Sequence, residues 1–245
     1  MSLDTLKQKT EQLIEKAKVC NWFETSFIAN GYFPTVCKDK ALMTYVPDLD
    51  IRGTTNFNST FSGCSSLETI GNLDLSDGTD FSSFCYNCSS LKTVGKLKTN
   101  SGVNFTGMFE SCTELTEIGE LNTTSATTLR SVFYACYSLE TLPTLDLTNA
   151  TDTEWMFSGC RELQKVKLVG SLNCDLDIHW STKLTAESAK SIMLALTNFT
   201  DTENEYMYSL TFSSATWDML NAEGSTAPTG ETWFDYVINT LKWNA

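Results

Sequence analysis

The stretch FSGCSSLETIG (residues 61–71) decides the fold of this chain, because close copies of it return at a constant interval. Each copy has a cysteine in its fourth position, and successive cysteines are 24 residues apart. A period of about 20 to 50 residues is typical of a solenoid, in which each unit buries its apolar side against its neighbours. The other copies are CYNCSSLKTVG (85–95), FESCTELTEIG (109–119), FYACYSLETLP (133–143) and FSGCRELQKVK (157–167), and the five cysteines are Cys64, Cys88, Cys112, Cys136 and Cys160.

Apolar residues recur at fixed distances on both sides of each cysteine. After it, apolar residues three, six and nine positions on alternate with polar ones, ending with Val169 in the last unit, which favours a short strand. Before it, apolar residues seven, four and three positions away complete an i, i+3, i+4, i+7 spacing, which predicts one face of a short helix. The pattern therefore predicts an α/β repeat solenoid whose units are a short helix followed by a strand.

The amino-acid sequence of these units resembles that of a known repeat family. MFESCTELTEI (108–118) and MFSGCRELQKV (156–166) resemble the BspA-like leucine-rich repeats and the allied bacterial surface-protein repeats that often read MFxGCxxL. The resemblance covers about residues 33–178 and implies a leucine-rich-repeat type stack of strands, with short helices on the opposite side. Members of this family are exposed on bacteria, some protozoa and some bacteriophages, where they act as adhesion or recognition modules.

The repeats divide the chain into three parts. Residues 33–178 form the predicted solenoid, and within it residues 33–56 are a degenerate capping repeat in which Lys40 replaces the cysteine. Residues 1–32 contain a predicted helix with a heptad-like apolar spacing. This helix either covers the open first repeat or forms a short coiled-coil anchor that oligomerises the chain. The candidate oligomerisation residues are Leu3, Leu6 and Leu13.

Residues 179–245 lose the repeat period and are predicted to form an α+β C-terminal cap. A helix is expected over 184–200 with Thr185 as its N-cap, followed by a strand over 208–213 and helices over 214–224 and 231–243. The strand is expected to extend the solenoid sheet. The aromatic residues expected to cover the last apolar layer are Trp217, Trp233, Phe234 and Trp243.

Charge and hydropathy exclude several partners. The formal net charge is −13 and the basic residues form no stripe, so nucleic acid and anionic lipid are not expected as partners. No apolar run is long enough to span a membrane, so no membrane insertion is expected. The first 22 residues alternate charged and apolar positions, and no export signal is expected there.

Residues able to carry chemistry are sparse. The single histidine, His179, could join Cys174, Asp175 and Asp177 in a metal site, but it lies where the repeats give way to the cap and irregular polar residues are expected. Cys85 and Cys88 have CxxC spacing, but packing on the predicted helix face explains this pair better than redox chemistry. We expect no enzymatic activity, no cofactor and no metal, and we expect the five repeat cysteines to form a ladder of free, buried thiols.

Function is therefore expected on the exposed surface. The polar residues between the inward positions of each strand should form two outward columns, with solvated surface as the alternative interpretation. Tyrosines beside the cysteine positions and one tryptophan offer a second surface, since the repeat does not require them. The hypothesis is a recognition or structural protein that binds protein or glycan, either a bacteriophage virion component that also contacts other virion proteins through its N-terminal helix, or a bacterial cell-surface adhesin. The candidate partner-binding residues are Glu68, Lys92, Glu117, Glu140, Lys165, Tyr86, Tyr134, Tyr137 and Trp155.

Overall fold

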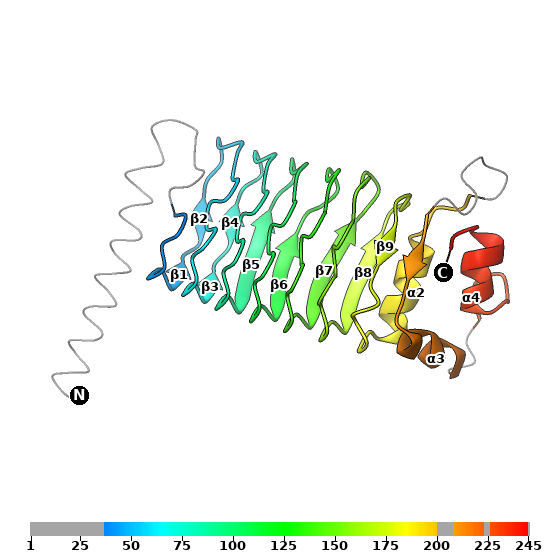
Figure 1. Ribbon diagram of the computed structural model, residues 1–245. Helices are drawn as coiled ribbons and strands as arrows, with labels where there is room; N and C mark the ends of the chain where they lie inside the picture. The colour runs from blue at the N-terminus through cyan, green and yellow to red at the C-terminus, as the bar shows by residue number, and fades with distance from the viewer. Residues whose placement is uncertain (1–36, 200–207, 223–225, 245) are drawn as a thin grey trace.

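The computed structural model describes residues 37–199, 208–222 and 226–244, and it has the form of a row of stacked coils with helices at one end (Figure 1). The strands of successive coils pair in parallel, so the molecule is a parallel β-solenoid of about five turns. The predicted repeat solenoid is thus confirmed. The helix expected over 1–32, with Leu3, Leu6 and Leu13, lies outside the described residues.

The main sheet contains eight strands, and its register repeats the sequence period. Thr69 is paired with Thr93, and Thr93 in turn with Glu117, so each partner is 24 residues further along the chain. In the first two coils the strand is interrupted, whereas later coils contribute one continuous strand. The strands are β1 (Tyr45–Val46), β2 (Leu49–Asp50), β3 (Thr69–Ile70), β4 (Leu73–Asp74), β5 (Thr93–Lys98), β6 (Glu117–Leu121), β7 (Thr141–Asp146) and β8 (Lys165–Val169).

The segment before each cysteine is not helical, which corrects the helix predicted from its spacing. Alternate N–H groups donate to the next coil: those of Phe57 and Phe61 donate to the carbonyl oxygens of Asp80 and Phe84, both at 2.7 Å. The N–H groups between them close tight turns, as when Cys64 N–H donates to Phe61 O at 3.1 Å. The backbone therefore forms a ladder of turns between coils, in place of the i→i−4 bonds of an α-helix.

Left-handed residues explain why the segment cannot be helical. The residues five and one before each cysteine have positive φ, a conformation that interrupts a right-handed helix. Mostly small or polar residues occupy these positions, and they tolerate the conformation better than bulky ones. The pairs are Ser59 and Gly63, Ser83 and Asn87, Gly107 and Ser111, Ser131 and Ala135, and Trp155 and Gly159.

The apolar spacing nevertheless identified the side chains that face inward. The phenylalanines before the cysteines stack from coil to coil, with ring centroids 5.4 Å apart for Phe57 and Phe81 and 6.0 Å apart for Phe133 and Phe157. The capping repeat behaves as expected, since Val46 is fully buried and Lys40, in the cysteine position, is exposed. The period thus fixes the core, although the path of the backbone differs from the prediction.

The repeat cysteines form the predicted ladder, and all eight cysteines within the described ranges are free and buried. Each repeat thiol donates to a carbonyl oxygen of the preceding coil, for example Cys88 Sγ to Phe61 O at 3.0 Å and Cys136 Sγ to Phe109 O at 3.1 Å. Burial raises the pKa of the Cys136 thiol. The cysteines are therefore suited to a position where a small apolar side chain must also satisfy one buried carbonyl.

A bulge in β7 changes the last strand. The register shifts between Thr141 and Thr144, where Pro143 stands in the place that glycine occupies in earlier coils. Leu145 consequently pairs with Leu168, which is buried. The expectation that Val169 fills this inward position is therefore wrong, because the last unit is one residue shorter here.

The cap follows the predicted order of elements with one correction. Thr185 is the N-cap of α2 (Ala186–Leu194), as expected. The strand β10 (Leu210–Thr211) pairs with β9 (Leu176–Asp177) in a separate two-stranded sheet, so it does not extend the main sheet. Trp233 and Trp243 are buried, whereas Phe234 is 41% exposed. The remaining elements are α3 (Ser214–Ala222), α4 (Trp233–Asp235) and the π-helical turn Tyr236–Thr240, and no helix in the described part of the chain could cross a membrane.

Candidate recognition surface

The strand face carries the predicted polar columns. Its candidate residues Glu68, Lys92, Glu117, Glu140 and Lys165 are all exposed, as expected from the alternation. Lys92 Nζ lies 3.4 Å from Glu68 Oε2 and 4.0 Å from Glu114 Oε2, so part of the charge is paired along the column. Such exposed pairs contribute at most about 1 kcal/mol each. The geometry of this face is that of a solvated surface with mixed charge.

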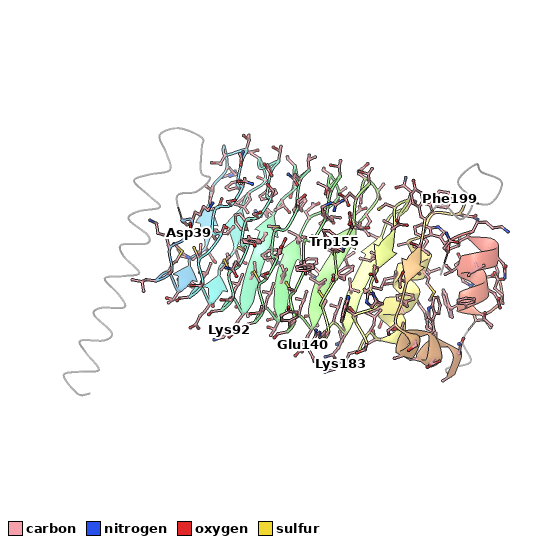
Figure 2. The ribbon with its side chains drawn as sticks, in the orientation of Figure 1. Asp39, Lys92, Glu140, Trp155, Lys183 and Phe199 are labelled. Atoms are coloured by element: carbon pink, nitrogen blue, oxygen red, sulfur yellow. The ribbon has the colours of Figure 1, made fainter. Side chains whose placement is uncertain are left out.

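The turn face, which is formed by the turn segments around each repeat cysteine, carries the aromatic candidates. Tyr86, Tyr134, Tyr137 and Trp155 are 41%, 39%, 46% and 53% exposed. In Figure 2, Trp155 lies away from the edge along which Lys92 and Glu140 are found. Tyr86 and Tyr134 share one column, but they are two coils apart and Glu110 stands between them in the repeat. The structure thus separates Tyr86 from the aromatic residues near the C-terminal end of the solenoid.

Trp155 differs in size and type from the residues that occupy the equivalent position in the other coils. Its φ is 57°, in the left-handed region where a bulky side chain is an outlier. Holding a residue in such a conformation costs about 1–3 kcal/mol. Because the side chain is half exposed, burial does not offset this cost fully. The residues at this position in the other coils are Ser59, Ser83, Gly107 and Ser131.

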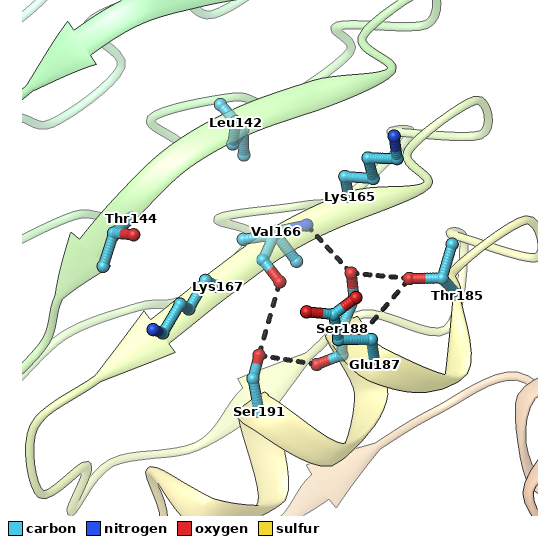
Figure 3. A pocket seen from close by; sticks show the side chains of 9 residues that line it. All are labelled: Leu142, Thr144, Lys165, Val166, Lys167, Thr185, Glu187, Ser188 and Ser191. Atoms are coloured by element: carbon cyan, nitrogen blue, oxygen red, sulfur yellow. Dashed lines mark hydrogen bonds between the residues drawn. The ribbon is translucent and has the colours of Figure 1, made fainter.

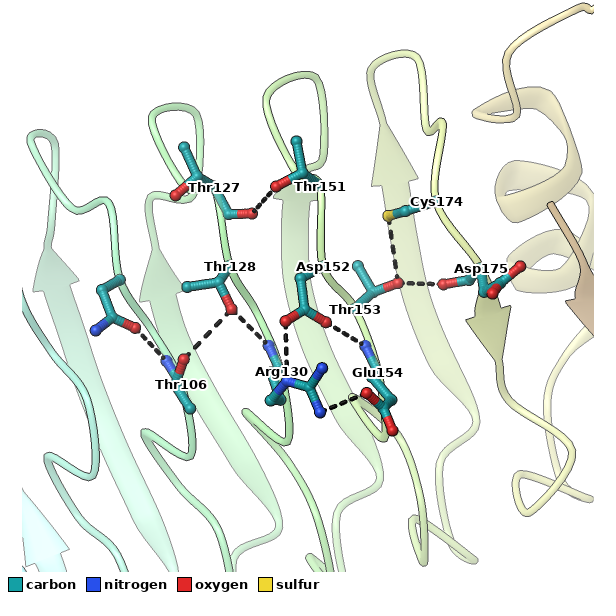
Figure 4. A network of polar contacts seen from close by, with 11 residues as sticks. Thr106, Thr127, Thr128, Arg130, Thr151, Asp152, Thr153, Glu154, Cys174 and Asp175 are labelled. Atoms are coloured by element: carbon teal, nitrogen blue, oxygen red, sulfur yellow. Dashed lines mark hydrogen bonds and ion pairs between the residues drawn. The ribbon is translucent and has the colours of Figure 1, made fainter. Parts of the chain in front are cut away.

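A charged network formed with Asp152 and Glu154 holds Arg130 in place (Figure 4). The Arg130 guanidinium carbon lies 5.6 Å from the centroid of the Trp155 ring, within range of a cation–π interaction. Arg130 Nε donates to Asp152 Oδ2 at 2.9 Å, and its Nη1 forms an ion pair with Glu154. The hydrogen bond to Asp152, together with the ion pair with Glu154, raises the pKa of Arg130. The arginine therefore orients one face of the indole.

A second arginine joins two further aromatic rings. The Arg161 guanidinium carbon lies 5.4 Å from the Tyr137 ring centroid and 5.6 Å from that of Trp180. Trp180 is 41% exposed, and the His179 ring lies 4.9 Å from it. The sequence reasoning missed Arg130, Arg161 and Trp180. The available signal was that both arginines stand where the other coils have neutral or acidic residues.

The residues of the alternative metal site have other partners. His179 Nδ1 lies 2.5 Å from Asp177 Oδ1, and the backbone N–H of His179 donates to the same oxygen at 3.1 Å. Asp175 Oδ1 accepts from the N–H of Ser209 at 2.7 Å. Within the described residues, no three metal-ligating side chains converge. The geometry gives the metal interpretation no support.

Two cavities flank the end of the solenoid. The first has a volume of about 370 Å³ and lies between the last full coil and β9. It is lined by Thr151, Asp152, Thr153, Glu154, Trp155, Cys174, Asp175, Asp177 and Tyr208.

The second cavity has a volume of about 300 Å³ and lies between the β7 bulge, β8 and α2 (Figure 3). Ser188 Oγ lies there between the Val166 N–H and the Gln164 carbonyl oxygen, and Ser191 Oγ donates to Val166 O. The hydroxyl groups of Ser188 and Ser191 are therefore occupied in joining α2 to β8 and the residue before it.

The fold defines the class of this chain as a parallel β-solenoid repeat protein. Residues 55–168 match a protein family described as "Mycoplasma protein of unknown function, DUF285". The match covers the repeats and agrees with a surface-protein repeat of the BspA kind, without singling out the BspA-like leucine-rich repeat. No curated protein and no solved structure matches the chain.

Proposed function

We propose that this protein is a non-enzymatic recognition protein, in which the solenoid presents aromatic and arginine side chains to a protein or glycan partner. The observation that carries the proposal is Trp155, a half-exposed aromatic residue held at positive φ and oriented by Arg130. A strained backbone persists only where the surrounding structure maintains it, and such strain clusters at binding sites.

The rigidity of the scaffold supports the same proposal. Tyr137 and Trp155 lie on neighbouring coils whose backbones are hydrogen-bonded to each other, as when Ala135 N–H donates to Ser158 O of the following coil at 2.8 Å. Large aromatic side chains held in fixed positions lose little conformational entropy on binding, and tryptophan, tyrosine and arginine are enriched in binding hot spots. The three residue types occur together on this face.

Two settings are compatible with a recognition protein. The first is the surface of a bacteriophage virion, as a fibre, decoration or receptor-binding protein, with the N-terminal segment contacting other virion proteins or further copies of the chain. The second is a bacterial cell surface, and it is favoured by the similarity of the repeats to a family described from Mycoplasma. Immunogold labelling of cells and of purified particles with an antibody against the solenoid would distinguish them.

The experiment for the proposed function compares the two faces of the solenoid. The probes are a panel of immobilised glycans and a display library of peptides, tested with the wild type and two double variants. The turn-face variant is Trp155→Ser/Tyr137→Ser, and each serine is the residue that earlier coils carry at the same position. Ser59, Ser83 and Ser131 correspond to position 155, and Ser65 and Ser89 correspond to position 137. The matched strand-face control is Lys92→Thr/Glu140→Thr. Threonine is chosen because Thr116 occupies the same position in the coil between them.

We expect the turn-face variant to lose binding by about tenfold or more and the control to retain it. Both variants should keep the wild-type circular dichroism spectrum and melt no lower than the wild type, since each substitution is native to the repeat and serine tolerates the left-handed conformation at position 155 better than tryptophan. Loss of binding in the strand-face control alone would refute the assignment to the turn face. Equal binding by all three proteins would refute both surfaces.

A further inference from the structure

Arg161 lies against two aromatic rings at the C-terminal end of the turn face. Its guanidinium carbon is 5.4 Å from the ring centroid of Tyr137, which occupies the same position one coil earlier, and 5.6 Å from that of Trp180. A ring face attracts the positive charge but offers no lone pair to the N–H groups of the guanidinium. The two rings therefore hold Arg161 in place and leave its donors without an oxygen acceptor.

The charge of Arg161 is also unpaired in the part of the chain that the structure describes, because no carboxylate there forms an ion pair with it. Arg130 makes the same kind of contact with an indole, but two carboxylates pair with its guanidinium. The carboxylate next to Arg161 in the chain, that of Glu162, pairs instead with Lys183. Arg161 thus presents a free cationic fork whose geometry matches a carboxylate.

Two neutral donors lie beside this cation. The indole N–H of Trp180 and the hydroxyl of Tyr137 have no hydrogen-bond partner within the described ranges, and both side chains are nearly half exposed. An exposed donor is satisfied by water until a ligand oxygen replaces that water. The three side chains therefore offer one charged and two neutral hydrogen-bond donors at one place on the surface.

The backbone fixes the positions of both rings. Gly159 lies against Tyr137, and a Cβ at Gly159 would be 3.2 Å from Tyr137 Cε1, so a larger residue there would crowd the ring. The segment that carries Trp180 is joined to the preceding coil by the buried hydroxyl of Ser181, which donates to Cys160 O at 2.9 Å. The side chains are therefore positioned before a ligand arrives, which lowers the entropy cost of binding.

We propose that Arg161, Tyr137 and Trp180 form a subsite for a sugar acid, a pyranose that carries a single carboxylate. The carboxylate accepts two N–H groups of Arg161, and hydroxyl oxygens of the sugar accept from the Trp180 indole and the Tyr137 hydroxyl. The C–H groups of the sugar ring pack on the exposed parts of the two aromatic rings. This inference rests on the proposed recognition function and names its partner class as an acidic glycan.

Charge favours this ligand over other anions. The chain has a net charge of −13, so it repels a partner that carries many negative charges. One guanidinium matches one carboxylate, and the rest of the subsite is neutral and aromatic. A sugar acid supplies the single carboxylate, the hydroxyl groups and an apolar ring face together. An acidic peptide also offers a carboxylate, and it is therefore the competing probe.

The test is an NMR titration of the full chain, followed through the indole N–H signal of Trp180, which Trp180→Phe assigns. The probes are the methyl glycosides of glucuronic acid and of glucose, which differ in the carboxylate, and a blocked threonine–glutamate–threonine tripeptide. We expect the glucuronide to bind about tenfold more tightly than the glucoside. Arg161→Thr should abolish this preference, and Arg161→Lys, which keeps the charge but loses the fork, should reduce it.

The matched control is Lys92→Thr on the strand face. Like Arg161→Thr, it removes one positive charge and introduces a residue that another coil carries at the same position. Those residues are Thr116 for position 92 and Thr113 for position 161. The control should keep the full preference for the glucuronide, since it leaves the subsite unchanged.

Several results overturn the sugar acid as the ligand. They are equal binding of the two glycosides, a glucuronide preference that survives Arg161→Thr, and no binding of either glycoside. Tighter binding of the tripeptide than of the glucuronide would make the partner an acidic protein segment. In each case the recognition function is decided separately, by whether the Trp155→Ser/Tyr137→Ser protein loses binding to the glycan and peptide panels, because that comparison requires no carboxylate.

Discussion

Replacing Gly95 by alanine is expected to destabilise the solenoid, because the new methyl group would meet backbone atoms of the preceding coil. A Cβ built on Gly95 would lie 2.8 Å from the carbonyl carbon of Gly71 and 2.9 Å from its oxygen. Ordinary contacts of a Cβ atom lie between 3.4 and 4 Å. The two coils would have to separate by several tenths of an ångström at a point where parallel hydrogen bonds hold them.

The magnitude follows from comparison with neighbouring glycines. Overpacking a well-packed interior costs about 1–3 kcal/mol, and Gly95 belongs at the upper end because two of the three nearest atoms are backbone atoms of Gly71, which cannot move aside as the Asn72 side chain can. Gly119 occupies the same position one coil later, where the nearest contacts would be 3.1 and 3.3 Å, so Gly119→Ala should cost about 1 kcal/mol. At Gly53 no atom lies within 4 Å, but φ is +89°, so Gly53→Ala should cost about 1 kcal/mol through conformation alone.

The assay is urea unfolding combined with hydrogen exchange, since a repeat array can open locally. For a chain of this length each kcal/mol corresponds to a change of about 2–4 °C in melting temperature. We expect the order Gly95→Ala, then Gly119→Ala, with exchange in β3 and β5 fastest in the first variant. A Gly95→Ala protein as stable as the wild type, or more stable than Gly119→Ala, would show that the coils are not held at this spacing.

Two further predictions concern the core and the sheet. The buried thiols of Cys112 and Cys136 should resist alkylation in the folded protein and react fully in urea, and rapid labelling without denaturant would contradict the ladder. At the sheet, hydrogen bonds from Lys98 (3.0 Å) and Ser76 lower the pKa of Asp74, so the stability they contribute should be complete above about pH 4 and lost as the pH falls through the lower folded-state pKa. Urea titrations at several pH values should show this loss in the wild type, and an Asp74→Asn variant with the same acid dependence would refute it.

Most of the core was predictable, and the backbone path was not. The spacing of apolar residues determines which side chains face inward, and it predicted the burial of Phe57, Leu67 and Cys112. The same spacing is satisfied by a helix and by a ladder of turns, so it could not separate them. The distinguishing signal was present in the residues five and one before each cysteine, where Ser59 and Gly63 favour left-handed backbone and disfavour a helix.

The candidate site was predictable only in part. Trp155 and Tyr137 stood out because the repeat does not require them, and both are exposed. The roles of Arg130 and Arg161 depend on contacts between coils, at separations of roughly one period, and no local pattern reveals which rings they approach. Residue Tyr208 comes to the cavity through the pairing of β10 with β9, which the sequence did not predict.

The position of the candidate site follows from the physics of a repeat. Every coil presents the same donors and acceptors to the next, so the last coil must end with open groups unless the cap supplies partners. The cap here completes the strand side, where Thr185 N–H donates to Gln164 O at 3.0 Å. On the turn side it leaves Thr151 O and Thr153 N–H open within the described residues, beside the one coil whose left-handed position holds a tryptophan. The open groups and the departure from the repeat therefore lie in the same coil, within two residues of Thr153.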